Sequence, residues 1–397
     1  IKMNKCARVL FSVLLLLTFA ALLAEPIAAE ELKTVTDMRG VEVSIPEDPQ
    51  RVVAISRGLI DTTMYVFGIE DKLVGGSVTS GDYEDYTYAG EIYHVCTQIS
   101  KVINPNYRNL TNVGGFGGPY GTVNVETIAS LEPDLLILRD FGNADEDVKK
   151  FLESAGQLEI PVVVLRSQAP GSGSGGDYND RVDVSTIYEE VRLLGEVFDQ
   201  QDRAEEIVEH MDAQVRLIRD RTKDIREEDK PRVLYFGAPT WAGDQGGAGF
   251  AFGTGTIESI LMEDIVNAKN AYYGVGTDIL STEHLLALDP DIIILPTYSG
   301  YHPPREIYEA ERFDKVQDLR ALKEGKVYAL SATPVKSERL EFPINLMIEA
   351  KAIYPERFED IDLEEWVRDY FMGLYGVDEE KAEELMGSLL LRYLEII

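Results

Sequence analysis

The chain has 397 residues, of which 45% are hydrophobic, and its formal net charge is −32. This length supports two or three domains with substantial cores. So large an excess of negative charge argues against binding to nucleic acid or to anionic membrane surfaces, and it is typical of a solvated acidic surface. Cys6 falls in the leader described next, so Cys96 would be the single cysteine of a mature chain, which excludes an intramolecular disulfide.

Residues 1–29 are predicted to be a secretory signal peptide, with cleavage after Ala29. Basic residues are followed by an apolar run and then by small residues: Lys2, Lys5, Arg8, Val9 to Leu23, Ala24, Ala28 and Ala29. The run of about fifteen residues is short for a membrane span, so an uncleaved anchor is the alternative. No cysteine stands at the cleavage point to carry a lipid. We therefore expect a secreted protein, periplasmic or on the cell surface.

An N-terminal lobe is predicted for residues 30–198. It opens with a hairpin over 35–43, a strand over 51–55 and a helix ending at Gly68. Residues 77–112 are polar and rich in tyrosine without a clear period, and we interpret them as an insertion or long loop. Strands over 135–138 and 161–165 follow, with a helix between them. Short apolar runs that alternate with helices predict an α/β lobe with a mostly parallel sheet.

A long helix is predicted from Gln201 to Ile225, within a linker of residues 199–226, because apolar residues recur on one face. It would act as a stiff connector between the lobes. The C-terminal lobe, residues 227–397, repeats the plan of the first. It has a strand over 232–236, a glycine-rich loop from Gly243 to Gly255, a helix near 256–265, a strand over 326–330 and a helical C-terminus.

The two lobes share a repeated segment. Residues 125–138 return as residues 282–295, and in both copies a glutamate (Glu126, Glu283) stands seven residues before a Pro-Asp pair and an apolar run. The pattern predicts a helix ended by proline and then a strand buried on both faces. Copies this far apart are not solenoid repeats. They indicate two similar lobes with a cleft between them, and hence a ligand-binding protein.

The candidate ligand residues follow the predicted strands, because ligands of open α/β sheets bind at the carboxyl ends of strands. They are cations and aromatic residues in an otherwise acidic chain: Arg57, Tyr120, Arg139, Arg166, Trp241, Tyr298, Tyr301, His302, Lys336 and Arg339. Arginine's planar group suits carboxylates, catecholates and other oxyanions. The cluster favours a sizeable anionic ligand. The alternative for any one arginine is an ion pair with one of the many acidic residues.

The sequence does not support catalysis. It has no G-x-S-x-G, H-E-x-x-H or G-x-x-x-x-G-K-[ST] motif. Gly171-x-Gly173-x-x-Gly176 matches a dinucleotide fingerprint only formally, because Pro170 separates it from the preceding strand, and we interpret it as a flexible loop. We expect no cofactor and no metal bound directly by the protein.

The pattern as a whole resembles the class III substrate-binding proteins of ABC importers, over residues 34 to about 376. The matching residues are Thr36-Asp37-x-x-Gly40, Pro49-x-Arg51-Val52-Val53, Gly114-Gly115, Asn124-x-Glu126, Pro133-Asp134, Leu194-Gly195, Arg203-Ala204-Glu205, Leu319-x-Ala321-x-x-x-Gly325-x-Val327-Tyr328 and Pro355-Glu356-Arg357-Phe358. The resemblance implies two Rossmann-like lobes joined by one rigid helix, with little hinge motion. It also implies that Glu126 and Glu283 dock to permease arginines. The alternative is a plain solvated glutamate favoured by the helix dipole.

We therefore expect a monomeric, non-enzymatic substrate-binding component of an ABC transporter. Its ligand would be an anionic metal chelate, with a ferric siderophore favoured and cobalamin, haem or a molybdate-type oxyanion as alternatives within the family. A secreted metal-dependent hydrolase, with its site in the same cleft, is the alternative from another class.

Overall fold

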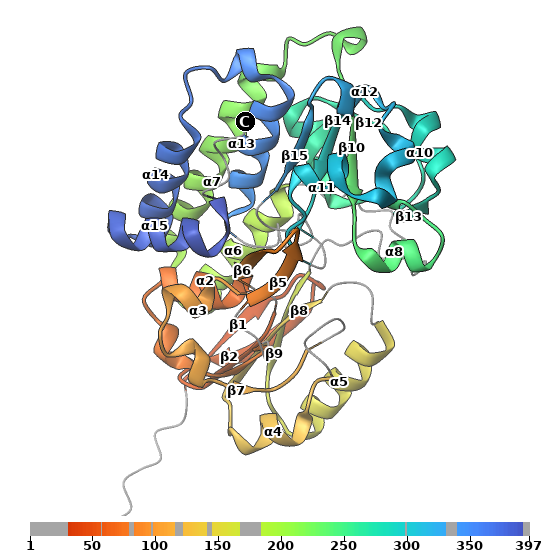
Figure 1. The fold of residues 1–397 in the computed structure, drawn as a ribbon. Helices are drawn as coiled ribbons and strands as arrows, with labels where there is room; N and C mark the ends of the chain where they lie inside the picture. Colours follow the sequence, from red (N-terminus) through yellow and green to blue (C-terminus); the bar gives the residue numbers. More distant parts are fainter. Residues whose placement is uncertain are drawn as a thin grey trace, which may run out of the picture.

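Each half of the chain folds around one β-sheet (Figure 1). The computed structural model describes residues 31–56, 58–78, 83–96, 98–115, 122–140, 145–166, 184–297, 300–330 and 340–391. The predicted signal peptide lies outside these residues. Among the described residues, no helix combines the length and the apolar character that a membrane-spanning segment needs.

The described residues of the first lobe form nine strands with connecting helices, and the lobe leads into two long helices. In chain order its elements are β1 (Leu32–Thr36), β2 (Glu42–Pro46), β3 (Val52–Ile55), α2 (Leu59–Val66), η1 (Glu70–Lys72), β4 (Leu73–Gly76), β5 (Tyr83–Tyr88), β6 (Glu91–Cys96), α3 (Ser100–Ile103), η2 (Tyr107–Asn109), β7 (Thr111–Asn112), α4 (Val125–Ser130), β8 (Leu135–Asp140), α5 (Asp145–Gln157), β9 (Val162–Arg166), α6 (Val184–Val197) and α7 (Gln201–Thr222).

The second lobe and the C-terminal helices follow. Their elements are η4 (Glu227–Asp229), β10 (Arg232–Gly237), α8 (Thr240–Asp244), β11 (Gly249–Phe252), α9 (Ile257–Leu261), the π-helix η5 (Met262–Val266), β12 (Lys269–Asn270), β13 (Thr277–Leu280), α10 (Thr282–Leu288), β14 (Ile292–Leu295), α11 (Pro304–Glu309), η6 (Glu311–Val316), α12 (Arg320–Lys323), β15 (Val327–Ala329), α13 (Phe342–Ile353), η8 (Pro355–Arg357), α14 (Leu363–Tyr375) and α15 (Glu379–Ser388).

The first sheet has the order β7-β4-β3-β8-β9, and all its neighbouring strands are parallel. Successive residues of a strand point to opposite faces. Leu135 and Ile137 of β8 accordingly join a core with α2 and α6, whereas Leu136 and Leu138 join a second core with α4 and α5. Burial on both faces explains why the sequence of β8 is continuously apolar, and it confirms the predicted parallel α/β lobe.

The second sheet, of order β13-β11-β10-β14-β15, departs from this plan at one edge. β10, β14 and β15 are parallel, and β12 pairs with β10, but β11 and β13 are antiparallel. The predicted glycine-rich loop therefore contains a strand. Gly249 makes this possible, because a Cβ atom there would lie 2.4 Å from the carbonyl oxygen of Gly237 on the paired strand.

The repeated segment forms the same structure in both lobes. Asn124 caps α4 through the amide of Thr127, and Ser281 caps α10 through the amide of His284. The residue before each proline is left-handed, with φ of 47° at Glu132 and 38° at Asp289. The helix-proline-strand prediction is thus confirmed in α4–β8 and α10–β14.

The aspartate of each Pro-Asp pair then ties its strand to the neighbouring one. Asp134 accepts hydrogen bonds from the amides of Gln50 and Arg51, at 2.7 and 2.9 Å, where β3 begins. Asp291 accepts one from the amide of Arg232 at 2.8 Å, where β10 begins. In each lobe, the aspartate of the repeated segment therefore holds the first residues of the central strand by hydrogen bonds.

One apolar core runs through both lobes. α7 packs against α6, α13 and η5, and its buried residues join the core that also contains β3 and β10 residues. α14 and α15 fall in the range predicted for the second lobe, yet they pack on α2, α3 and β6 of the first (Figure 1). The lobes are thus joined by a layer of helices, with α7, about 33 Å long, as one member.

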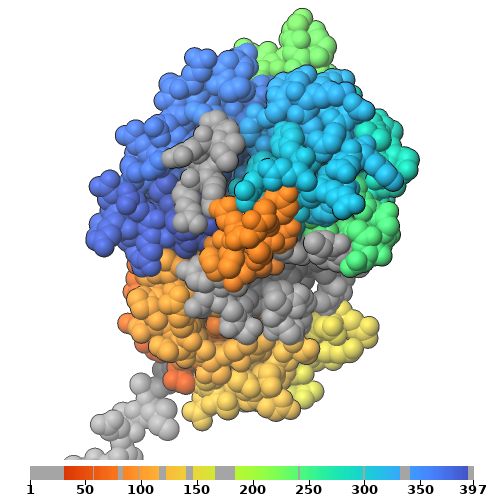
Figure 2. Space-filling view, in the orientation of Figure 1, coloured from red at the N-terminus to blue at the C-terminus, as the bar shows by residue number. Residues whose placement is uncertain are grey.

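The described part of residues 77–112 contains strands and helices, which corrects their interpretation as a long loop, while the alternative of an insertion stays a prediction. β5 and β6 form a two-stranded hairpin, which we call the arm, and Tyr88 pairs with Glu91 across the turn. The turn residues Ala89 and Gly90 both have positive φ, 48° and 84°, as a two-residue type I′ turn requires. In Figure 2 the arm lies in orange between the two lobes.

Candidate functional site

The carboxyl ends of the central strands lie side by side in each lobe. In the first lobe Ile55 pairs with Leu138, and Asp140 pairs with Arg166, so β3, β8 and β9 end at one edge of the sheet. In the second lobe β10, β14 and β15 run parallel and end together in the same way. In the sequence, every predicted ligand residue except Tyr120 stands at one of these strand ends or within ten residues after it. A binding site at the carboxyl edges stays a prediction.

The structure describes only some of these residues. Arg57, Tyr120, Tyr298, Lys336 and Arg339 lie outside the described residues. Arg166 ends β9 and Trp241 stands in α8, but their side chains are likewise not described. Arg139, Tyr301 and His302 are described in full, and their surroundings can be compared with the predicted role.

Arg139 makes a buried ion pair with Glu190 of α6. Its Nε and NH2 atoms lie 2.6 and 2.5 Å from the two carboxylate oxygens, and both side chains are almost fully buried. The guanidinium is therefore neutralised within the first lobe. This geometry matches the ion-pair alternative for this arginine better than a free ligand-binding cation.

Tyr301 and His302 lie beneath the arm. The Tyr301 ring is 5.5 Å from the ring of Tyr93, and the His302 ring is 4.0 Å from that of Tyr86. His302 Nδ1 lies 2.8 Å from Glu306 Oε2, while the buried Nε2 atom has no hydrogen-bond partner. A buried polar atom without a partner costs free energy, so Nε2 would gain from a hydrogen bond to a ligand.

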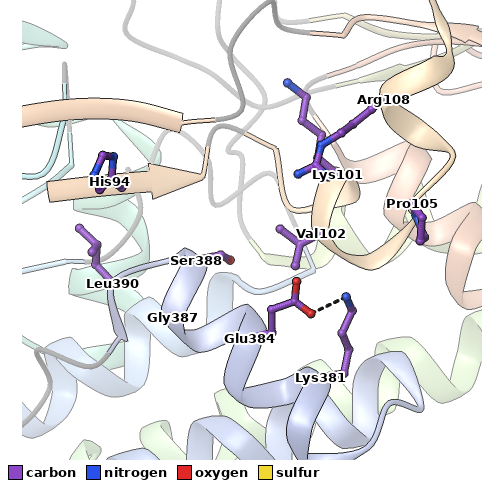
Figure 3. A pocket seen from close by; sticks show the side chains of 10 residues that line it. All are labelled: His94, Lys101, Val102, Pro105, Arg108, Lys381, Glu384, Gly387, Ser388 and Leu390. Carbon is purple, nitrogen blue, oxygen red and sulfur yellow. Dashed lines mark hydrogen bonds and ion pairs between the residues drawn. The ribbon is translucent and has the colours of Figure 1, made fainter.

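A groove of about 580 Å³ lies between the arm, α3 and α15 (Figure 3). Its charged lining residues are His94, Lys101, Arg108, Lys381 and Glu384, and Lys381 and Glu384 are paired at 2.7 Å. Of the predicted ligand residues, the three that the structure describes in full, Arg139, Tyr301 and His302, do not line this groove.

A metal centre built from the protein is not seen in the described residues. Within them, no three histidine, cysteine, aspartate or glutamate side chains converge in a way that could hold a metal ion. Glu306 nevertheless gathers three partners, which are His302, Tyr86 at 2.7 Å and Arg312. In this buried cluster the Glu306 carboxylate has three partners, whereas His302 Nε2 has none.

Glu126 and Glu283 occupy equivalent positions, each the second residue of a capped helix. Both side chains are exposed. The pKa of Glu283 is lowered, chiefly by hydrogen bonds from its own amide and from Ser281. A charged, exposed carboxylate therefore stands at the start of one helix in each lobe, which suits contact with basic residues of a partner.

Sequence reasoning missed the arm, Glu190 and Glu306. The arm did have a signal, since Tyr86, Tyr88, Tyr93 and Val95 alternate with polar residues on either side of Ala89-Gly90. Ala at the first turn position, where Asn or Asp is usual, weakened that signal. Glu190 and Glu306 had no signal in the sequence, because any of the seventy acidic residues could have been the partner of a given cation.

The known proteins that this chain resembles include solute-binding proteins of bacteria. The molybdate-binding protein MolA of Haemophilus influenzae is 23% identical over 362 residues, which are 86% of this chain and 91% of MolA. An uncharacterized ABC transporter substrate-binding lipoprotein of Bacillus subtilis, YvrC, is 24% identical over 82% of this chain and 87% of its own. A periplasmic solute binding protein of Veillonella parvula shares the fold with a TM-score of 0.66, at 20% identity, over 91% of this chain and 99% of its own.

A model of the periplasmic binding protein family matches residues 53–334, which cover most of the first lobe, the segment between the lobes and the part of the second lobe up to Pro334. The chain belongs to the periplasmic binding protein family, as one of its class III members, which are substrate-binding proteins of ABC transporters.

Proposed function

We propose that this protein captures an anionic metal chelate, a ferric siderophore in the first instance, and delivers it to an ABC permease. The observation that carries the proposal is the alignment of the strand ends, because it brings the residues after β3, β8 and β9 to one edge of a sheet. Arg57 and Arg166 follow two of these strands. Cations gathered at one edge would neutralise a ligand that the acidic chain otherwise repels.

The ligand residues we propose come from both lobes. They are Arg57, Tyr120, Arg166, Trp241, Tyr298, Tyr301, His302, Lys336 and Arg339. Arg139 was predicted with them, but its pairing with Glu190 favours a supporting role under the site. The cations would bind the anionic groups, and the aromatic rings would cover apolar parts of the chelate.

Molybdate is the second candidate, since MolA binds molybdate and is similar to this chain over most of both lengths. A bare oxyanion needs a small pocket of hydrogen-bond donors, which arginines and backbone amides could supply. Cobalamin and haem remain alternatives that would use the aromatic residues more than the cations.

Delivery would use Glu126 and Glu283 as contacts for permease arginines. We further propose that the protein is a monomer, is exported by the segment 1–29 and has no enzymatic activity. The relatives are transport binding proteins, which supports a non-enzymatic role over the metal-dependent hydrolase.

Titration of the purified mature protein tests the proposal. The probes are a ferric tris-catecholate, a ferric hydroxamate, haemin, cyanocobalamin, sodium molybdate and zinc sulfate, with binding followed by tyrosine and tryptophan fluorescence and by thermal shift. Tight binding of a ferric chelate, weakened by Arg57→Ala, is the expected result. Binding of molybdate and of no other probe would replace the ferric siderophore by molybdate as the proposed ligand and would keep the transport role. Hydrolysis of an ester or phosphoester that chelators abolish would replace the transport proposal.

A further inference from the structure

The arm presents one face to the second lobe and the other to solvent. Residues of a strand alternate between faces, and directly opposite residues of a hairpin share a face. The pairs Tyr86–Tyr93 and Tyr88–Glu91 lie on the inner face, and they supply the contacts to the second lobe described below. On the outer face, Thr87 and Ile92 are exposed. The alternation therefore selects residues for contact between the lobes.

Glu306 of α11 anchors this contact. Its carboxylate accepts a hydrogen bond from the Tyr86 hydroxyl at 2.7 Å, although the two residues are 220 positions apart. The same carboxylate contacts Arg312 and lies 2.8 Å from His302 Nδ1. Burial acts to raise the pKa of Glu306, but these hydrogen bonds outweigh it and the pKa is lowered. The anchor is thus an ionised carboxylate with charge-assisted partners.

Contacts on either side of Glu306 extend the interface. Arg305 lies 2.8 Å from Glu91 and its guanidinium is 5.4 Å from the centre of the Tyr88 ring. Tyr93 and Val95 form an apolar cluster with Tyr301 and with Leu390, which follows α15. The arm therefore meets the second lobe and the C-terminal helical segment at once.

Gly300 lets the arm approach closely. Its φ is +97°, and a Cβ atom there would lie 2.7 Å from Tyr86 Cβ. Any other residue at this position would be strained and would push the arm away. This glycine gives a way to disturb the contact without removing any of its polar groups.

We propose that the arm is a clasp that fastens the first lobe to the second, with Glu306 as its anchor and as the residue that positions His302. The clasp does not depend on which ligand binds. The positioning of His302 rests on the proposed function, because His302 matters there as a ligand residue. Glu306 fixes the ring by its contact at Nδ1, which leaves Nε2 free to meet a ligand.

Hydrogen exchange measured by mass spectrometry on the full mature protein tests the clasp. Tyr86→Phe, Glu306→Gln and Gly300→Ala should each speed exchange at least tenfold in both 83–96 and 304–309. Two controls should leave both segments unchanged. Thr87→Ala alters the outer face, and Gly255→Ala imposes a similar strain, at φ +83°, where a Cβ would meet nothing within 4 Å. Unchanged exchange in all three clasp variants, or equal effects in the controls, would overturn the proposal.

Nuclear magnetic resonance of ¹⁵N-labelled histidine tests the positioning of His302 without any ligand. An ionised Glu306 can only accept, so Nδ1 of His302 should carry a proton in the wild type. His302→Gln identifies the signal. Glu306→Ala should release the ring to a mixture of tautomers, whereas Thr87→Ala should not. A single Nδ1-protonated ring that persists in Glu306→Ala would refute the positioning role, whatever the titrations show of the ligand.

Discussion

Arg139 and Glu190 form a two-pronged ion pair inside the first lobe, with Nε to Oε1 at 2.6 Å and NH2 to Oε2 at 2.5 Å. Arg139 lies near the carboxyl end of β8, and Glu190 belongs to α6. The pair therefore fixes the helix that leads into α7 to the strand that leads into the candidate site. Breaking this ion pair should lower the stability of the fold, and any effect on ligand affinity would be indirect.

Arg139→Ala should lower the free energy of unfolding by about 3–5 kcal/mol, because it breaks a buried ion pair by removing one of its members. The double change Arg139→Met with Glu190→Leu should recover most of this loss, since an apolar pair of similar volume replaces both charges. Urea denaturation followed by circular dichroism measures the two effects. An Arg139→Ala variant as stable as the wild type would show that the pair is solvated in solution.

Glu349 should make the protein less stable as the pH rises. Burial raises the pKa of Glu349 to about 8, helped by the charge of Glu258 and opposed by the Tyr235 hydroxyl. Between pH 4.5 and about 8 the unfolded chain loses this proton while the folded chain keeps it. The free energy of unfolding should therefore fall across that range, by on the order of a few kcal/mol. Well below pH 4.5 Glu349 is protonated in both states, so it makes stability no more and no less dependent on pH there.

Glu349→Gln should remove this part of the pH dependence, because the amide does not titrate. Urea midpoints at pH 5, 6.5 and 8 compare the variant with the wild type, and Glu380→Gln on the surface of α15 is the control. Parallel curves for Glu349→Gln and the wild type would mean that the buried carboxylate does not titrate in this window.

The sequence was sufficient for the parts of the fold that repeat. The helix, the Pro-Asp pair and the apolar strand are local features, and each lobe contains the whole signal in fourteen residues. The arm, by contrast, is stabilised by Glu306 and Tyr301, more than two hundred residues away from Tyr86 and Tyr93. Its strands do alternate apolar and polar residues, but Ala89 at the first turn position weakened the hairpin signal.

The candidate site was predictable by position more than by role. The apolar runs located the strand ends, and the ligand candidates were chosen because they follow those ends in the sequence. Whether an arginine can bind a ligand depends on its partners in the folded protein. Arg139 pairs with Glu190, which lies on a helix 51 residues later in the chain. His302 was correctly placed after β14, but its burial under the arm could not be read from the sequence.

Substitutions in the groove of Figure 3 separate it from the predicted cleft. If the ligand binds at the strand ends, Lys101→Met with Lys381→Met should leave its affinity within about twofold, while Arg57→Ala with Arg166→Ala should weaken it at least tenfold. The reason is that an anionic ligand loses a charge-assisted partner only where it touches one. Fluorescence titration with the ferric tris-catecholate and with molybdate gives both constants. The reverse order of effects would place the ligand in the groove.

Reversing Glu126 and Glu283 to lysine should abolish ligand uptake in cells that carry the cognate permease, while the affinity of the purified protein stays unchanged. Each carboxylate is exposed at the second position of a capped helix, so the change removes an attraction to permease arginines and adds a repulsion. It also opposes the helix dipole, at a cost of roughly 0.3–1 kcal/mol per site. Glu380→Lys carries the same cost in the first turn of α15 and should transport normally. Uptake that survives the double reversal would show that the two glutamates do not carry docking.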